Sequence, residues 1–196
     1  MRQHDADRTG HSDGQSHGMT KMYLRFGAMI LTAMVVMYAV MFVSSWQWSH
    51  IRFSESRVFM ALTMGGTMGL IMLGYMLNMY RNTKANLAIV AASLLLLGGG
   101  VFLDRSQTTV QDAGWMESMI PHHSMAITRS EHAQIVDARV CELAKRISKA
   151  QREEILQMEW LIEDIERNGV AATVRQASQR PVPTFEESAD RQCPAG

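Results

Sequence analysis

Three long uncharged runs constrain this fold more than any other feature of the chain. Residues 26–43, 58–77 and 87–103 contain no Asp, Glu, Lys, Arg or His. At about 1.5 Å per helical residue, each run roughly matches a hydrocarbon core of about 30 Å. We therefore predict three transmembrane helices, at about 24–43, 58–79 and 86–103, in a membrane domain covering 22–104. A proton relay normally needs an ionisable group within a span, and these runs offer none.

The basic residues predict the orientation of these spans. With the N-terminus inside, the cytoplasmic side holds Arg2, Arg8, Lys21, Arg25, Arg81 and Lys84, and the opposite side holds Arg52, Arg57 and Arg105. Cytoplasmic loops are enriched in Lys and Arg, so this bias favours a cytoplasmic N-terminus. Everything after residue 104 then lies outside the cytoplasm. If the chain is bacterial, as the family resemblance given below implies, it is an inner-membrane protein whose C-terminal part is periplasmic.

Composition separates the remaining segments and limits the partners. Net charge is zero and no basic stripe exists, so we expect membrane lipid and no nucleic acid as a partner. Residues 1–21 are polar and residues 170–196 show little periodicity. Both segments are predicted to be disordered, the first as a cytoplasmic N-terminus and the second as a tail.

Residues 105–169 have the pattern of an amphipathic helical hairpin. The first helix should run from about Thr108 to His132 or Ala133, with a kink at Pro121. The second should begin after Asp137, run about 30 residues, and end at Asn168-Gly169. Its apolar side consists of Val140, Leu143, Ala144, Ile147, Ile155, Met158, Leu161, Ile162 and Ile165. The fold class is thus all-α, with three spans followed by a soluble hairpin.

A lone hairpin cannot cover the apolar faces of both helices, so something else must pack on it. A second copy would complete a four-helix bundle, which makes a homodimer the first expectation. Packing against the periplasmic ends of the spans is the alternative.

The stretch Trp115–Ile127 concentrates groups that bind metals. Helical spacing places Asp112, Met116, Met119 and His123 on one face, with His122 at its edge. Thioether and imidazole ligands suit copper, above all Cu(I), better than Mg²⁺ or Ca²⁺. On the second helix, Met158 is a further candidate ligand and Glu154 could orient a histidine. Met125 and His132 form a weaker second candidate. The alternative is that these methionines are ordinary core residues.

Catalysis finds little support in the sequence. The hairpin contains no Glu-x-x-His pair of the kind that builds di-iron sites. No Ser, Cys or Thr nucleophile is arranged with a base, so we do not expect an enzyme.

Two further features leave their roles open. The second span carries Met60, Met64, Met68, Met72 and Met76, which are either a thioether path for Cu(I) or flexible apolar filler beside the close-packing motif of Gly65 and Gly69. Cys141 and Cys193 can form at most one bridge in an oxidising compartment. Cys141 alone is more typical of a small buried apolar residue.

The segment from Asp112 to Leu161 resembles a bacterial family known as domain of unknown function 305. The matching residues are Asp112, Met119-Ile-Pro-His-His123, Ala126, Ala150-Gln151, Glu154-Ile155, Met158 and Trp160-Leu161. The resemblance implies a ferritin-like half bundle in a membrane-anchored subset of the family. Some members are periplasmic copper-binding proteins linked to copper or silver resistance.

Carried over by residue, the resemblance implies copper binding at Met119, His122 and His123, and at Met116. Many members place a methionine in an Ala-x-x-Met after the histidine pair, whereas here Met125 precedes Ala126 and Arg129 takes that position. The expected function is copper sequestration or transfer, with other copper-handling proteins as partners. The alternative is a membrane-anchored oligomerisation module that binds no metal.

Overall fold

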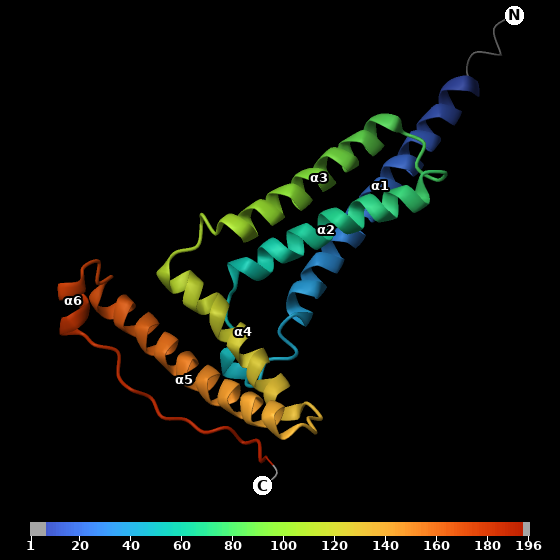
Figure 1. Ribbon diagram of the computed structural model, residues 1–196. Coiled ribbons are helices and arrows are strands. Elements are labelled where there is room, and N and C mark those ends of the chain that lie inside the picture. The colour runs from blue at the N-terminus through green and yellow to red at the C-terminus, as the bar shows by residue number, and fades with distance from the viewer. Residues whose placement is uncertain (1–6, 194–196) are drawn as a thin grey trace, which may run out of the picture. The chain divides into compact units, whose positions relative to one another are not determined.

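The protein is helical throughout the part that the structure describes. The computed structural model describes residues 7–193, with side chains from Gly18 onward, and contains no strand there. Its elements are α1 (Asp7–Val40), the 3-10 helix η1 (Trp48–His50), α2 (Glu55–Met76), α3 (Thr83–Ser106), α4 (Asp112–His132), α5 (Ala138–Asn168) and α6 (Val174–Gln179) (Figure 1). This confirms the all-α class.

The chain divides into two compact units. Residues 1–40 and 58–107 form the first, called here the apolar unit, and residues 41–57 and 108–196 form the second, the hairpin unit. The loop between the first two apolar helices therefore belongs with the hairpin.

Three helices are long and apolar enough to cross a membrane, as predicted. The candidate spans are 18–40, 55–76 and 83–106. The first two end at 40 and 76, three residues earlier than the predicted spans, which ended at 43 and 79. After α2 the chain turns at 77–80, where the amides of Met79 and Tyr80 donate to the Met76 carbonyl, and Tyr80 folds back into the core. The residues after α2 are apolar because they form a turn that packs Tyr80 into the core, and they do not extend the span.

The N-terminal segment differs from its expected disorder. Helix α1 begins at Asp7, so residues 7–21 are helical, while residues 1–6 lie outside the described part. Helix α1 continues without a break into the first apolar run, and an existing helix can be extended without a second nucleation step.

Aromatic residues join the three helices of the apolar unit. Phe26, Leu73 and Tyr80 are buried together, with the Phe26 and Tyr80 ring centroids 5.4 Å apart in an edge-to-face arrangement. The Tyr23 hydroxyl donates to the Asn86 side chain over 2.8 Å, and the Asn86 amide donates to the Tyr80 carbonyl over 2.7 Å. These bonds fix the α2–α3 turn against α1.

Glycines allow α2 and α3 to approach closely. A Cβ on Gly66 would lie 2.5 Å from the Ser93 carbonyl oxygen, and one on Gly69 would lie 2.5 Å from the Ser93 hydroxyl. A Cβ on Gly65 would instead meet the sulfur of Met34 in α1 at 2.3 Å. The Gly65/Gly69 motif thus packs against both neighbouring helices.

The methionine ladder winds around α2, as its four-residue spacing requires. Met72 and Met76 pack against the aromatic core, whereas Met60 and Met64 are exposed. The ladder therefore does not form one continuous stripe.

The hairpin has the predicted ends. The Asp137 carboxylate accepts from the Arg139 amide over 2.8 Å, and Gly169 ends α5 with φ of 75°. Helix α5 has 31 residues, close to the expected 30. Helix α4 begins at Asp112 rather than Thr108, because Gln107 closes α3 in a left-handed conformation, and it continues through Pro121.

The tail after residue 170 is ordered, so its predicted disorder is wrong. Thr173 and Gln176 form a capping box that starts α6, and the chain then returns along α5 (Figure 1). Arg180 donates to Asp164 over 2.6 Å, and Cys193 forms a disulfide with Cys141 on α5. The weak periodicity of the tail does not reveal this packing, because an extended segment held by side-chain pairs has no helical period.

Replacing Gly66 by Ala should weaken the packing of α2 on α3. The new methyl group would collide with backbone atoms, 2.5 Å from the Ser93 oxygen and 2.6 Å from the Leu97 nitrogen. Overpacking of this kind costs about 1–3 kcal/mol. The Gly98→Ala variant is the matched control, because nothing lies within 4 Å of a Cβ there. Thermal unfolding of the full chain in detergent, followed by circular dichroism, should show a lowered midpoint for Gly66→Ala alone, and equal midpoints would contradict the packing.

Candidate functional site

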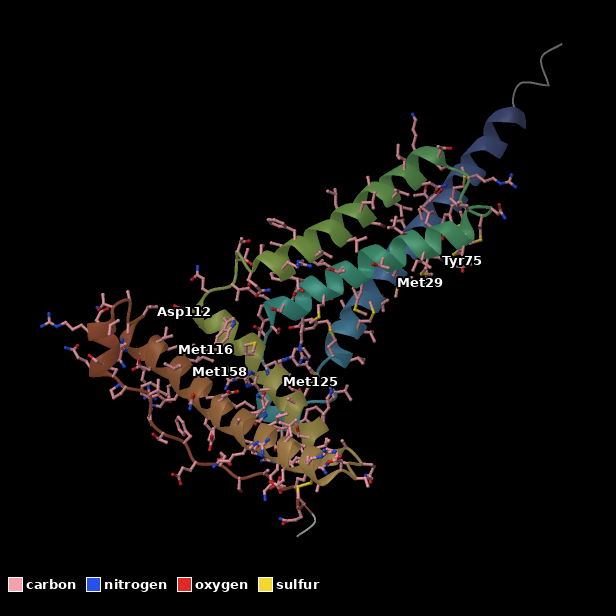
Figure 2. The ribbon with its side chains drawn as sticks, viewed as in Figure 1. Met29, Tyr75, Asp112, Met116, Met125 and Met158 are labelled. Atoms are coloured by element: carbon pink, nitrogen blue, oxygen red, sulfur yellow. A yellow bond between two sulfur atoms is a disulfide. The ribbon has the colours of Figure 1, made fainter. Side chains whose placement is uncertain are left out.

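Methionines occupy the interface between α4 and α5. The buried core consists of Met116, Ile120 and Ile127 from α4 and Ile155, Met158 and Ile162 from α5, with Met119 packed against it. Figure 2 labels Met116 on α4 and Met158 on α5. Helical spacing on both helices directs these thioethers inward. The structure thus brings Met116, Met119 and Met158 of the candidate set into one cluster.

His123 pairs with Glu154 beside this cluster. The Nδ1 atom of His123 lies 3.0 Å from Oε2 of Glu154. This Nδ1 is buried from solvent, yet it lacks a hydrogen-bond partner of acceptable direction. The short distance therefore reports proximity of the carboxylate rather than a formed hydrogen bond. A buried N–H without a partner is costly, so a small rotation that lets Nδ1–H donate to Glu154 is favoured, and Nε2 then carries the free lone pair.

Burial keeps His123 neutral. Loss of solvent lowers the pKa of its imidazole below the ordinary value, and this effect outweighs the nearby Glu154 carboxylate, which acts in the opposite direction. The adjacent His122 lowers the pKa further. A neutral imidazole has the free lone pair that a metal ligand needs.

The other candidate residues lie elsewhere. His122 is exposed, with its ring centroid 6.2 Å from that of His123, and Asp112 is exposed at the start of α4. Met125 receives the Arg57 guanidinium at 3.8 Å from its sulfur. The His132 ring lies 5.4 Å from that of Trp46. Met125 and His132 thus have separate partners.

Histidines, cysteines and carboxylates do not form a metal cluster by themselves. Within the described residues, no group of three or more such side chains is close enough to hold an ion. A metal at His123 would therefore need the thioethers as further ligands.

The loop 41–57 docks directly on the histidine motif. Ser124, which follows the histidine pair, is fully buried; its hydroxyl accepts from the Trp46 amide over 2.7 Å and lies 2.9 Å from Nδ1 of His50. Trp46 packs against the hairpin core. Arg52 adds an ion pair to Glu159 on α5 at 3.1 Å.

His50 is neutral in this position. Burial lowers its pKa below 6.5; Glu159 raises it, and Arg52 and Arg152 lower it further. The loop is therefore held to Ser124 by an uncharged imidazole.

A buried carboxylate joins the far end of α4 to α5 and to the tail. Glu131, 4% exposed, accepts from the Ser148 hydroxyl and from the Asp190 amide, and lies 3.5 Å from Arg152. Arg152 also pairs with Asp190 at 2.7 Å and lies over the Trp46 ring at 5.0 Å. Four segments thus meet at Arg152.

Arg191 caps the C-terminal end of α4. Its guanidinium donates to the carbonyls of Ser130, Glu131 and Ala133, the last over 2.6 Å. These carbonyls lack helical partners at the end of α4, and a cation there also suits the helix dipole. The tail is therefore part of the hairpin unit.

A comparison with known families covers this unit. Residues 112–192 match the family model described as "Domain of unknown function (DUF305)". The hairpin resembles the DUF305 family. The resemblance predicted from the sequence is confirmed. The DUF305 match extends beyond α5 through α6 to Asp190 and Arg191, so it includes the tail that completes the hairpin.

A curated relative extends the similarity beyond this segment. "Uncharacterized protein L153" of Acanthamoeba polyphaga mimivirus is 28% identical over 144 residues, covering 70% of this chain and 93% of that protein. The aligned length exceeds that of the DUF305 match, so similarity includes residues outside 112–192. No solved structure matches.

The sequence contains no pattern that identifies the residues around the histidine motif. Ser124, His50, Trp46, Glu131 and Arg152 hold the loop, hairpin and tail together, yet none lies in a local pattern typical of a site. The one available signal was the position of a small polar residue, Ser124, directly after the histidine pair and on the apolar side of α4. The partners of these residues lie far away in sequence.

Acidification should weaken the docking of the loop through His50. Its folded pKa lies below 6.5, so neutral His50 contributes fully above pH 6.5, and this contribution is lost as the pH falls through 6.5 towards the folded pKa. One proton changes the free energy of unfolding by at most about 1.4 kcal/mol per pH unit. The thermal midpoint of the wild type should therefore fall more between pH 7.5 and pH 5.5 than the midpoint of His50→Asn does.

The comparison isolates His50 because His123, which titrates in the same direction, is present in both proteins. Identical pH profiles would show that His50 does not couple to folding.

Proposed function

We propose that this chain is a membrane-anchored copper-binding protein, in which α4 and α5 hold Cu(I) through thioether and imidazole ligands. The single observation that carries the proposal is the half-buried His123 imidazole next to the α4–α5 methionines, with Oε2 of Glu154 3.0 Å from its Nδ1. We assign the ligands by position. His123 and Met119 form the first pair, and Met116, Met158 and His122 complete the set.

The ligand chemistry supports copper over harder ions. Thioether sulfur is soft, and Cu(I) accepts sulfur and neutral imidazole together. Oε2 of Glu154 lies 3.0 Å from Nδ1 of His123, where it would accept from Nδ1–H, orient the imidazole and leave the Nε2 lone pair for the ion. Copper here is cargo rather than a resident cofactor, and the protein binds and releases it without turnover.

Ion entry is assigned to His122. Met116 and Met158 are buried in the α4–α5 core, whereas the adjacent His122 is exposed. An exposed imidazole next to a half-buried one provides a first contact for an incoming ion and a last contact for a departing one. Transfer to another copper-handling protein then proceeds by stepwise ligand exchange.

The Cys141–Cys193 disulfide supports a location for the hairpin outside the cytoplasm. Disulfides persist in oxidising compartments such as the periplasm. The Lys and Arg bias across the spans favours the same orientation, with the hairpin on the periplasmic side of a bacterial inner membrane.

Copper affinity of the full chain tests the proposal. The purified protein in detergent is titrated with Cu(I) against a colorimetric chelator. His123→Ala should abolish tight binding, and Glu154→Gln should weaken it about 10- to 100-fold as a residue that orients a ligand. Met119→Leu keeps nearly the same volume and removes only the sulfur, so it should lose affinity while retaining stability.

His132→Ala is the matched control, since His132 contacts Trp46 rather than the methionine cluster. If the folded wild type binds no Cu(I), or if His132→Ala weakens binding as much as His123→Ala, the proposal fails.

A specific observation also favours self-association of the hairpin. Val140, Leu143 and Ile147 are exposed on α5 at spacings of three and four residues, and exposed Val136 lies in the turn two residues before this helix. This spacing forms a narrow apolar stripe on α5 of the kind that pairs two helices. We infer a homodimer through this stripe, either alongside copper binding or as the main role of a purely structural module.

Removing the stripe should dissociate the dimer. The double variant Leu143→Ser/Ile147→Ser is compared with Val170→Ser/Val174→Ser, which removes two exposed apolar side chains outside the stripe. Molar mass in detergent, measured by light scattering after gel filtration, should halve only for the first variant, because each lost contact removes about 1–3 kcal/mol of apolar burial. A monomeric wild type would contradict the interface.

A further inference from the structure

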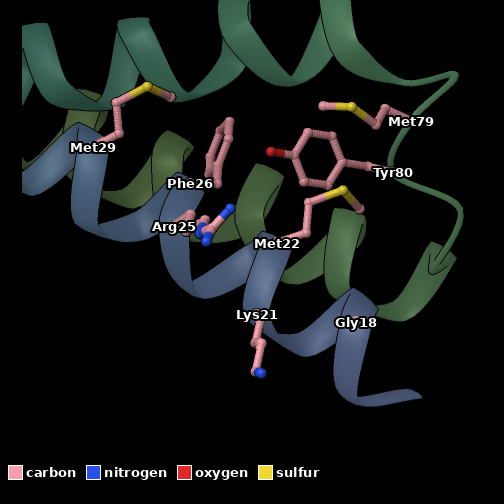
Figure 3. Close-up of a pocket in the computed structure, with 8 residues that line it drawn as sticks. All are labelled: Gly18, Lys21, Met22, Arg25, Phe26, Met29, Met79 and Tyr80. Atoms are coloured by element: carbon pink, nitrogen blue, oxygen red, sulfur yellow. The ribbon is translucent and has the colours of Figure 1, made fainter. Parts of the chain in front are cut away.

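A groove opens in the apolar unit between residues 18–29 of α1 and the turn that follows α2. It has a volume of about 550 Å³. Figure 3 shows Met22 and Phe26 of α1 facing Met79 and Tyr80, with Met29 one helical turn beyond Phe26. The groove walls are thus thioether and aromatic. Lys21 and Arg25, which also line it, are exposed and one helical turn apart.

The charged side chains described at this end of the unit are basic. Lys21 and Arg25 lie in the first eight residues of the candidate span 18–40, and Arg81 and Lys84 lie around the α2–α3 turn. Within residues 18–40 and 58–107 the only acid is Asp104, near the opposite end of α3. Twenty helical residues separate Lys84 from Asp104, which corresponds to about 30 Å. Within these residues, therefore, no carboxylate lies beside the cations of the groove.

The position of the groove determines which molecules reach it. Lys21 and Arg25 lie within the first eight residues of the candidate span 18–40, where a membrane helix meets the headgroup layer. An apolar groove at that depth is filled by the acyl chain of a neighbouring lipid, while the cations face its headgroup. The Arg guanidinium binds phosphate oxygens through two parallel N–H groups, and the Lys ammonium adds a point charge.

We propose that this groove is a binding site for one anionic phospholipid. Its phosphate contacts Arg25 and Lys21, and one acyl chain lies along Met22, Phe26, Met29 and Tyr80. Basic pockets between membrane helices bind anionic headgroups on the same electrostatic grounds. The site is independent of copper binding, since it involves only the apolar unit.

Lipid retention by the full chain tests this site. The protein is purified in neutral detergent and exposed to phosphatidylglycerol or to phosphatidylcholine with the same acyl chains. Native mass spectrometry then measures the fraction carrying one lipid. The wild type should prefer phosphatidylglycerol, and Lys21→Gln/Arg25→Gln should reduce that preference by about fivefold for each cation removed.

Arg81→Gln/Lys84→Gln is the matched control, because it removes the same charge from the same end of the unit but neither residue lines the groove. It should retain the wild-type preference. An equal loss in both double variants would reduce the effect to diffuse attraction by a basic end and would overturn the site, as would a wild type without preference.

The acyl chain is tested separately with glycerol 3-phosphate, which carries the phosphate alone. It should fail to displace phosphatidylglycerol at equal concentration. Displacement as effective as that by the lipid itself would identify a site for soluble phosphate and would refute the lipid assignment. Circular dichroism of each variant confirms that the helices are retained.

Discussion

The hairpin unit depends on covering the apolar faces that two antiparallel helices leave open. Two helices bury only the strip along which they touch, and about sixty residues make a marginal core. Here two segments from distant parts of the chain supply the missing cover. The loop 41–57 packs Trp46 on one side, and the tail returns along α5 to the disulfide at Cys141. The hairpin is therefore completed partly from its own chain before any second copy is considered.

This cover also determines the surroundings of the metal candidates. Ser124 is buried because the loop lies on it, and its neighbour His123 loses solvent at the same turn of α4. The same burial that stabilises the hairpin thus lowers the pKa of two histidines. The neutral imidazole of His50 holds the loop, while Nδ1 of His123 lacks a hydrogen bond of acceptable direction. One desolvated turn of helix therefore combines a structural contact with a candidate binding site.

The charged residues are arranged to match each environment. In the hairpin unit, buried Glu131 is satisfied by Ser148, Asp190 and Arg152, so a carboxylate is tolerated in a largely covered position. In the apolar unit Lys21, Arg25, Arg81 and Lys84 lie at one end, far along α3 from Asp104, which suits a headgroup layer rather than a protein core. Charge thus holds the hairpin unit together, and in the apolar unit it serves the proposed lipid site.

The sequence by itself determined the three apolar helices, the ends of α5 and the methionine–histidine face of α4. These features are local, because hydrocarbon thickness is matched by run length, and caps and helical faces depend on residues within a few positions. Only the tertiary structure decided that Trp46 reaches Ser124, 78 residues away, that Cys193 bonds Cys141, and that Glu154 rather than Asp112 lies beside His123. Those pairings depend on how separate segments pack, and no local pattern specifies which distant side chains fill the same space.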